Sequence, residues 1–421
     1  MADRLIIFED GNFGDFYPLT LSRPAYMLRC GAKMLWEKIA ANFDGYEINF
    51  ACRPEMTQIV KAQLGHNVNQ LNYQENDRLV FINGRLRLGP KLAEELKQGD
   101  TNRIFRQGET TAAYVIAQPL DKKPEDLTDL ASRDAADQMI GKCDVAEGEF
   151  EFYNHLWNLV DLNSTEISND FQTLAGKFDL ASMLEEARVD TSARILSPDN
   201  IYIAAGAEIG ANAVIDNRHG PVIIDRNAMI GPLSYIEGPC YIGPDTQIFR
   251  GNIREGCSFG PSCRVGGEVE ESIFQGFTNK YHDGFLGHAY LGSWVNLGAM
   301  TTNSDLKNNY KNITVSVNGR SVDTGLMKIG SYIGDHSKTG IGTLLNTGIS
   351  IGFSCNIYGG TLVTSREVPS FSWGDEKGYD IYRLDKAMEV ARSAMSRRNQ
   401  EFTAFDERLF AQIHEQAIAN R

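Results

Sequence analysis

Aliphatic residues recur at every sixth position over much of the C-terminal half of the chain. The recurring positions are Ile203, Ile209, Ile215, then Ile224, Ile230, Ile236, Ile242, Ile248, then Leu291, Leu297, and finally Ile333, Thr339, Leu345, Ile351, Ile357 and Val363. Neither a helix of period 3.6 nor an alternating strand produces this spacing. A solenoid does, because three hexads close one triangular coil. The spacing therefore predicts an all-β domain over residues 191–370, a left-handed parallel β-helix of hexapeptide repeats.

Two stretches depart from this rhythm. Residues 303–326 contain Asn318-Gly319 between two alternating segments, which is a strong hairpin signal. We expect this insertion to leave the solenoid as a β-arm that could reach a neighbouring subunit. The second departure, residues 268–287, contains His282.

The first 150 residues alternate between strand-like and helix-like patterns. Strands are predicted at residues 5–8, 47–51, 79–83 and 113–118, and helices at 25–43, 55–64 and 90–98. This alternation is typical of a Rossmann-like α/β domain whose parallel sheet is covered on both faces. Residues 151–190 are predicted to be a helical linker. Residues 371–421 are predicted to be a helical extension that either caps the solenoid or packs on a neighbouring subunit, and the sequence leaves both open.

Composition narrows the classes of partner. A net charge of −14 argues against a nucleic-acid or membrane-surface binder, although a few local cations can still hold phosphorylated metabolites. The start of the chain lacks a signal-peptide pattern, and the seven cysteines show no paired spacing. We expect a cytoplasmic protein.

The most informative stretch is residues 279–303, which carries His282 and, fourteen residues later, Asn296 before Leu297-Gly298-Ala299. It resembles the acetyltransferase half of the GlmU family, bifunctional enzymes that acetylate glucosamine 1-phosphate and then uridylylate it. The resemblance implies that His282 is catalytic and Asn296 binds substrate. It also implies that Gly298 and Ala299 contact acetyl-CoA, and that the protein is a homotrimer with sites between adjacent solenoids.

The chemistry explains the histidine. Attack of an amine on the thioester of acetyl-CoA requires loss of a proton near pH 7, which a neutral imidazole can accept. A backbone N–H at a coil corner could stabilise the developing oxyanion.

Some positions depart from the family. The phosphate-binding lysine before the histidine corresponds to Glu270, and the tyrosine after it to Phe285, which we retain as a substrate-binding candidate. Arg250 resembles the phosphate-contacting arginine once a short gap is allowed. Lys280, Lys307 or Lys311 could replace the missing cation. The acceptor can therefore differ from glucosamine 1-phosphate.

The N-terminus resembles the nucleotidyltransferase half of the same family. Gly11 and Gly14 lie in a glycine-containing turn followed by Pro-Leu-Thr and by Arg23-Pro24. Such turns let backbone N–H groups approach a triphosphate, here UTP. The signature arginine is missing, the Pro-Lys lysine is Ala25, and the aspartate that holds Mg²⁺ is Asn83. Phosphate binding would then depend on Arg23, Arg29 or Arg85. Nucleotidyl transfer with Mg²⁺ and a similar fold without that activity both stay open.

Two other classes of function compete with the transferase. Some hexapeptide solenoids are hydratases that bind zinc through three histidines, and His282, His288 and His336 are candidates. The first two are one hexad apart and fall on different faces, which disfavours a shared metal, so no metal ligand is predicted. A non-catalytic sugar-nucleotide sensor or scaffold is supported by the altered N-terminal signature and opposed by His282 and Asn296.

Overall fold

The computed structural model describes residues 3–70, 77–118, 144–174 and 180–421. The chain divides into two compact units. The first comprises residues 1–16, 22–28 and 33–154, and the second comprises residues 17–21, 29–32 and 155–421. The predicted boundary near residue 150 therefore lies close to the main division, but two short N-terminal segments belong to the second unit. Among the described residues, no helix is long and apolar enough to cross a membrane.

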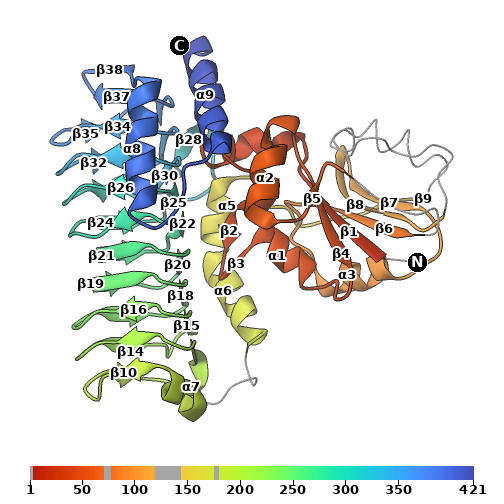
Figure 1. The fold of residues 1–421 in the computed structure, drawn as a ribbon, viewed down its shortest axis with the longest axis horizontal. Helices are drawn as coiled ribbons and strands as arrows, with labels where there is room; N and C mark the ends of the chain where they lie inside the picture. Colours follow the sequence, from red (N-terminus) through yellow and green to blue (C-terminus); the bar gives the residue numbers. More distant parts are fainter. Residues whose placement is uncertain (1–2, 71–76, 119–143, 175–179) are drawn as a thin grey trace. The chain divides into compact units, whose positions relative to one another are not determined.

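The first unit is built on one mixed sheet (Figure 1). Its strands, in spatial order, are β5 (Asn67–Val68), β4 (Glu47–Ala51), β1 (Asp3–Phe8), β6 (Arg78–Asn83), β8 (Thr110–Ile116), β7 (Arg103–Gln107) and β9 (Asp144–Glu147). Strands β1, β4, β5 and β6 run parallel, whereas β8 is antiparallel to both β6 and β7. The prediction of a wholly parallel sheet was wrong on this side, because Gly108 and Glu109 join β7 and β8 in a tight hairpin that leaves no room for a crossover helix.

The helices of this unit are short. They are α1 (Leu35–Ala40), α2 (Thr57–Leu64) and α3 (Pro90–Lys97). The helices predicted at 55–64 and 90–98 are confirmed, but a continuous helix over 25–43 was wrong. Gly31 there has a φ of +75°, and residues 29–32 belong to the second unit. A helix that ran through them could not satisfy both requirements.

The second unit is a parallel β-helix with three faces (Figure 1). The first face consists of β10 (Arg188–Val189), β13 (Glu208–Ile209), β16 (Met229–Ile230), β19 (Gln247–Ile253), β21 (Arg264–Glu270), β23 (Asn279–Lys280), β26 (Asn296–Leu297), β31 (Lys338–Thr339), β34 (Asn356–Ile357), β37 (Ser372–Asp375) and the antiparallel β38 (Gly378–Ile381).

The other two faces complete each coil. The second face consists of β11 (Arg194–Ile195), β14 (Val214–Asp216), β17 (Tyr235–Glu237), the last residues of β19 and β21, β24 (Phe285–Gly287), β27 (Thr302–Asn303), β32 (Leu344–Leu345) and β35 (Leu362–Val363). The third face consists of β12 (Ile201–Ile203), β15 (Val222–Ile224), β18 (Cys240–Ile242), β20 (Cys257–Phe259), β22 (Ile273–Gly276), β25 (Tyr290–Ser293), β30 (Ser331–Ile333), β33 (Ile349–Ile351) and β36 (Glu367–Val368).

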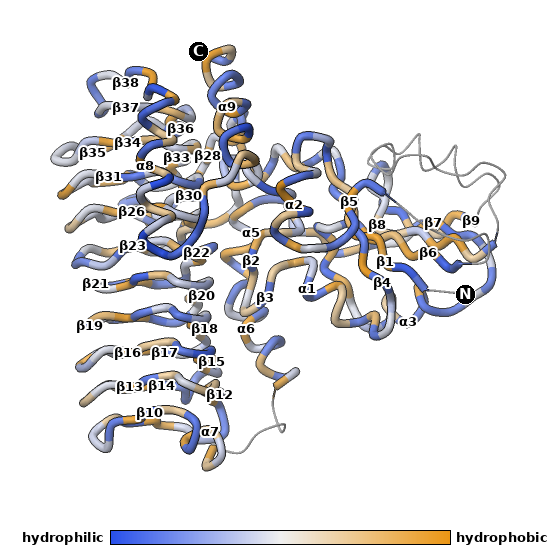
Figure 2. Tube along the Cα trace, in the orientation of Figure 1, coloured by the Kyte–Doolittle hydropathy of each residue, from blue (hydrophilic) through white to orange (hydrophobic). Residues whose placement is uncertain are grey.

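Every aliphatic residue that set the predicted period is buried in the single core of this solenoid. In Figure 2 the apolar residues along the coils alternate with polar ones, as expected when successive side chains of a strand point in and out. The apparent interruption at residues 268–287 was wrong. Val269, Phe274, Lys280 and Leu286 occupy inward positions there, at intervals of five or six residues, so the coil continues without a break.

The insertion forms the predicted hairpin, β28 (Thr314–Val317) paired with β29 (Arg320–Asp323). Asn318 and Gly319 form its turn, with φ of +51° and +74°. The hairpin lies on its own solenoid, since Ser316 and the Gly319 N–H both donate to the carboxylate of Glu367 in β36. Ile313 and Val315 are buried there. The arm therefore packs on its own chain.

Helices cover parts of the solenoid. The predicted linker contains α5 (Leu156–Asp161), α6 (Asn163–Gln172) and α7 (Leu180–Glu186). Helix α6 lies on the third face, where Asn163 donates to the Gly256 carbonyl oxygen at 2.8 Å. At the C-terminus, α8 (Leu384–Ser396) buries Ala387 and Ala391, and α9 (Ala404–Ala419) packs Phe410 against His336 and Phe353. The C-terminal helices thus pack on their own chain.

Candidate functional site

His282 lies at the corner where the first face turns into the second. The same column of corners holds Arg250, Gly266-Gly267, residues 281–284 and residues 298–301 on successive coils. The imidazole of His282 is exposed, and its ring lies edge-on to Tyr281 with centroids 5.7 Å apart. The corner beneath it is tight, because a Cβ on Gly266 would lie 2.3 Å from the Tyr281 carbonyl oxygen. Glycine is therefore required where the chain approaches the histidine loop most closely.

Lys280 supports this corner from inside the solenoid. Its side chain fills an inward position that is otherwise aliphatic, and only 2% of it is exposed. Its Nζ donates to the carbonyl oxygens of His282 at 2.7 Å and Gly266 at 2.9 Å. Burial lowers the pKa of Lys280 to about 8. Lys280 was predicted to be a substrate-binding cation, but its ammonium is directed at the backbone of the histidine loop.

Asn296 lies on the first face, one coil beyond His282. Asn279 and Asn296 are adjacent in register, and the Nδ2 of Asn279 donates to the Oδ1 of Asn296 at 3.2 Å. Arg398, which follows α8, donates from Nη2 to the Oδ1 of Asn279 at 3.0 Å. The exposed amide of Asn296 is thus oriented by a chain of two hydrogen bonds.

Arg250 and Phe285 flank the same corner. Phe249 stacks on Tyr281 with ring centroids 5.1 Å apart, and the guanidinium carbon of Arg250 lies 5.0 Å from the centre of the Phe249 ring. Phe285 points outward from the second face, in register with Glu268. The structure therefore brings Arg250, His282, Phe285 and Asn296 to one edge of the solenoid.

The corner at residues 298–301 presents a backbone N–H that can donate a hydrogen bond to an oxyanion or to an amide carbonyl oxygen. Gly298 N–H donates to the Thr339 carbonyl oxygen at 3.1 Å and Met300 N–H to Asp283 at 2.9 Å, but the described part of the chain offers no partner to the Ala299 N–H. A Cβ on Gly298 would lie 2.5 Å from Gly340, so glycine is needed for the coils to stack. These features fit the expected contact of Gly298 and Ala299 with acetyl-CoA.

Glu270, at the position of the family's phosphate-binding lysine, is buried in a charge cluster on the second face. Its carboxylate accepts from Arg254 Nη1 at 2.7 Å and Lys328 Nζ at 3.1 Å. The two cations neutralise it, so this position has become structural. Lys307 and Lys311 lie in the loop between β27 and the hairpin, so they are not part of the coil that carries His282. Lys307 donates to the Asn312 carbonyl oxygen.

His288 is also structural. Its Nδ1 lies 2.8 Å from Asp305 Oδ2, and its Nε2 lies 2.8 Å from Glu271 Oε2. Burial alone would lower its pKa, but the two carboxylates outweigh burial and raise the pKa to about 9. His282, His288 and His336 occupy three different corners of the prism. Within one chain they cannot share a metal ion, and the described residues contain no cluster suited to one.

In the N-terminal unit, the residues expected to bind a nucleotide or its metal ion form hydrogen bonds with one another. Arg85 is buried and binds Asp10 through Nε at 2.9 Å and Nη2 at 2.5 Å. Asn83 donates to the same carboxylate at 2.9 Å, a bond that an aspartate there could not make. Burial alone would raise the pKa of Asp10, but the Arg85 guanidinium lowers it.

This arrangement does not fit a magnesium site. Mg²⁺ needs free carboxylates together with substrate phosphates, and the Asp10 carboxylate is neutralised by Arg85. Gly11 and Gly14 lie in the short 3₁₀ helix η1 (Gly11–Phe16), beside Asp10 in sequence. Arg23 is buried in this unit, whereas Arg29 belongs to the second unit, where it donates to the Ala32 carbonyl oxygen.

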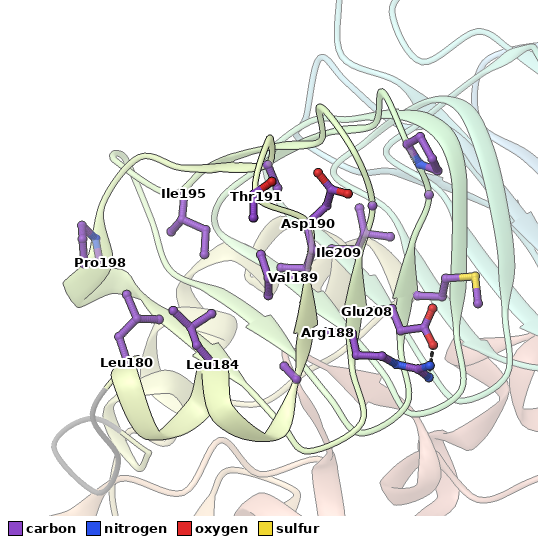
Figure 3. Close-up of a pocket in the computed structure, with 17 residues that line it drawn as sticks. Leu180, Leu184, Arg188, Val189, Asp190, Thr191, Ile195, Pro198, Glu208 and Ile209 are labelled. Carbon is purple, nitrogen blue, oxygen red and sulfur yellow. Dashed lines mark ion pairs between the residues drawn. The ribbon is translucent and has the colours of Figure 1, made fainter.

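A cavity of about 970 Å³ opens at the first coils of the β-helix, lined by Leu180 and Leu184 of α7 and by Val189, Ile195 and Ile209 (Figure 3). Of its three charged residues, Arg188 and Glu208 pair with each other, and Asp190 accepts hydrogen bonds from Ser192. The lining is mainly aliphatic and contains none of the predicted site residues. It is the gap between the first coil and α7, and it offers no group suited to catalysis.

Sequence reasoning missed three cations near Asn296: Arg264, Lys338 and Arg398. Arg264 and Lys338 lie on the first face in the same register row as Asn279 and Asn296. The sequence positions of Arg264 and Lys338 would have placed them in this row if the register of the coils had been known. Arg398 reaches the row only because α8 folds back over the solenoid, and no local pattern indicates this.

Comparison with known proteins shows which proteins this chain resembles. Residues 5–177 match the sugar nucleotidyl transferase family. The chain is 28% identical over 223 residues to the bifunctional protein GlmU of Acaryochloris marina, covering 47% of this chain and 44% of the relative. It is 28% identical over 261 residues to a bifunctional sugar-1-phosphate nucleotidylyltransferase/acetyltransferase of Sulfurisphaera tokodaii, covering 62% and 57% respectively.

The chain thus spans about half the length of the curated relatives that it matches. Among solved structures, an Arabidopsis UDP-N-acetylglucosamine acyltransferase covers 51% of this chain and 78% of its own, with 12% identity and a TM-score of 0.28. The family match over residues 5–177 and these relatives show that the chain is similar to GlmU-type bifunctional proteins.

Proposed function

We propose that the β-helix transfers an acetyl group from acetyl-CoA to the amine of an amino-sugar 1-phosphate at the His282 corner. The observation that carries the proposal is the exposed imidazole of His282 at a glycine-stacked corner, with the oriented amide of Asn296 one coil away. The relative from Sulfurisphaera tokodaii is named a bifunctional sugar-1-phosphate nucleotidylyltransferase/acetyltransferase, which supports the same class of reaction.

Each residue of the corner has a separate role in the proposed acetyl transfer. Acetyl-CoA supplies the acetyl group as a thioester. His282 accepts the proton that the amine loses as it attacks the carbonyl carbon, the C–S bond breaks, and the CoA thiolate leaves and is protonated. The Ala299 N–H stabilises the oxyanion or orients the thioester, Gly298 permits the close approach, and Asn296, Arg250 and Phe285 hold the acceptor.

In this proposal the protein works as a homotrimer, with each site completed by an adjacent solenoid. None of the described cysteines forms a disulfide and all are buried, which suits a reducing compartment, so we place the reaction in the cytoplasm.

For the N-terminal unit we propose binding of a sugar nucleotide or UTP without nucleotidyl transfer. The supporting observation is the Asp10–Arg85 pair, to which Asn83, at the position of the family's magnesium-holding aspartate, adds a hydrogen bond. Formation of a UDP-sugar would require that pair to open, because phosphoryl transfer depends on a metal and cationic clamps.

The test is a coupled assay of thiol release from acetyl-CoA with a panel of amino-sugar phosphates. We expect turnover with the wild type and a loss of at least about 100-fold with His282→Ala. His219→Ala is the matched control, because His219 is an exposed histidine elsewhere on the solenoid. No turnover on any acceptor would exclude acetyl transfer, and equal turnover in wild type and His282→Ala would remove His282 from the reaction.

A further inference from the structure

A row of polar side chains runs along the outside of the first face. Arg264, Asn279, Asn296 and Lys338 occupy equivalent positions on consecutive coils, in register with one another. Neighbouring coils lie ~4.8 Å apart, so these side chains stand side by side along the face. The row includes Asn296 and begins beside the His282 corner.

Arg398 adds a second guanidinium to this row. It enters from the turn after α8 and donates to Asn279 at 3.0 Å. Its Nε is buried and has no hydrogen-bond partner within the described chain. Arg398 also lies near enough to Arg264 to lower the pKa of that guanidinium, in addition to the larger effect of burial. Two like charges are therefore held together beside Asn279.

Among the described residues no carboxylate forms an ion pair with Arg264, Lys338 or Arg398, although the nearby Asp245 partly offsets the charge of Arg264. Arg264 donates to the carbonyl oxygens of Asp245 and Cys263, and Lys338 donates to the carbonyl oxygen of His336. Burial lowers the pKa of Lys338 to about 8. A chain with a net charge of −14 has many carboxylates, so three unpaired cations in one row indicate a site for an external anion.

We propose that Arg264 and Arg398 bind a phosphate group of a substrate next to Asn296, with Lys338 at the far end of the same site. Guanidinium groups suit this role, because their fork of donors matches phosphate oxygens. The site would replace the family's phosphate-binding lysine, whose position is Glu270 and is neutralised by Arg254 and Lys328. The assignment of the bound phosphate to a substrate rests on the proposed acetyl transfer.

Two substrates could bring the phosphate: the sugar 1-phosphate acceptor, or CoA with its adenosine bisphosphate. The kinetic test compares Arg264→Met and Arg398→Met with Arg397→Met, a matched control whose arginine is exposed one residue away. We expect the KM of one substrate to rise about 10- to 100-fold in both test variants, and kcat to change little. A higher KM for the amino-sugar phosphate assigns the site to the acceptor, and a higher KM for acetyl-CoA assigns it to CoA.

A binding measurement keeps the inference independent of turnover. Calorimetry on the full-length protein would use glucosamine 1-phosphate, glucosamine, and adenosine 3′,5′-bisphosphate as probes. We expect one phosphate-bearing probe to bind the wild type and Arg397→Met, and to bind both test variants at least about 10-fold more weakly, while glucosamine shows no difference. Unchanged binding of both phosphate probes in the two test variants would overturn the site. Loss of binding without any acetyl transfer would keep the phosphate site and refute the proposed reaction.

Discussion

The ammonium of Lys280 holds the carbonyl oxygen of His282 from inside the solenoid, at 2.7 Å. A charged side chain in this core is costly, and its pKa is lowered to about 8 accordingly. Its ammonium donates to the carbonyl oxygens of His282 and Gly266, and both residues lie in the corner that carries the proposed base. We infer that Lys280 is a positioning residue that fixes the histidine loop.

Lys280→Met should distinguish an effect of Lys280 on the position of the His282 loop from an effect on the stability of the fold. Methionine has a similar length and removes a buried charge, which offsets the two lost hydrogen bonds, so we expect the free energy of unfolding at pH 7 to change by less than about 2 kcal/mol. Acetyl transfer should fall at least about 10-fold in kcat, because the loop that carries His282 loses its support. Ile248→Val, another inward position, should leave kcat unchanged. A Lys280→Met protein with wild-type kcat would remove Lys280 from this role.

Lys280 also illustrates which parts of the fold could be predicted from the sequence and which could not. The hexad period predicted the solenoid because aliphatic side chains fill a narrow core. One coil was not recognised, because Lys280 occupies an inward position that is otherwise aliphatic. That His282 and Asn296 belong to one site was predicted from the resemblance to the GlmU family. The contact of Arg398 with Asn279 was not, since it depends on how α8 folds back. Likewise, nothing local indicates that Asp10 and Arg85, 75 residues apart, neutralise each other.

The His288 clamp predicts a pH-dependent stability. His288 has a pKa of 6.5 when unperturbed and about 9 in the folded chain, so its contribution is complete below pH 6.5 and disappears as pH rises through 9. The shift corresponds to about 3 kcal/mol. His288→Gln should be destabilised at pH 6, with the gap to wild type narrowing steadily by pH 9.5. Denaturant unfolding of both proteins across that range measures the difference. A gap that does not change with pH would contradict the charged state assigned to His288.

Glu270→Lys would restore the family's lysine, but we expect it to fail. The change replaces two ion pairs, with Arg254 and Lys328, by three neighbouring cations on a buried position. The free energy of unfolding should fall by roughly 3–5 kcal/mol, with no gain in acetyl transfer. Glu415→Lys, on the exposed side of α9, should change stability by less than about 0.5 kcal/mol. A stable Glu270→Lys protein with a lower KM for the acceptor would show that the position still faces substrate.

The Asp10–Arg85 pair makes a prediction about magnesium. Asp10 already has a cation in Arg85 and a donor in Asn83, so added Mg²⁺ should not raise the melting temperature of the wild type. The double variant Asn83→Asp with Arg85→Ala frees one carboxylate and adds another. It should be less stable without metal, because two carboxylates then face each other, and its melting temperature should rise with millimolar Mg²⁺. Arg87→Ala, which removes an exposed ion pair with Glu151, is the control and should show no Mg²⁺ dependence. A rise in the wild-type melting temperature with Mg²⁺ would mean that the pair opens to admit the metal, and nucleotidyl transfer by this unit would then regain support.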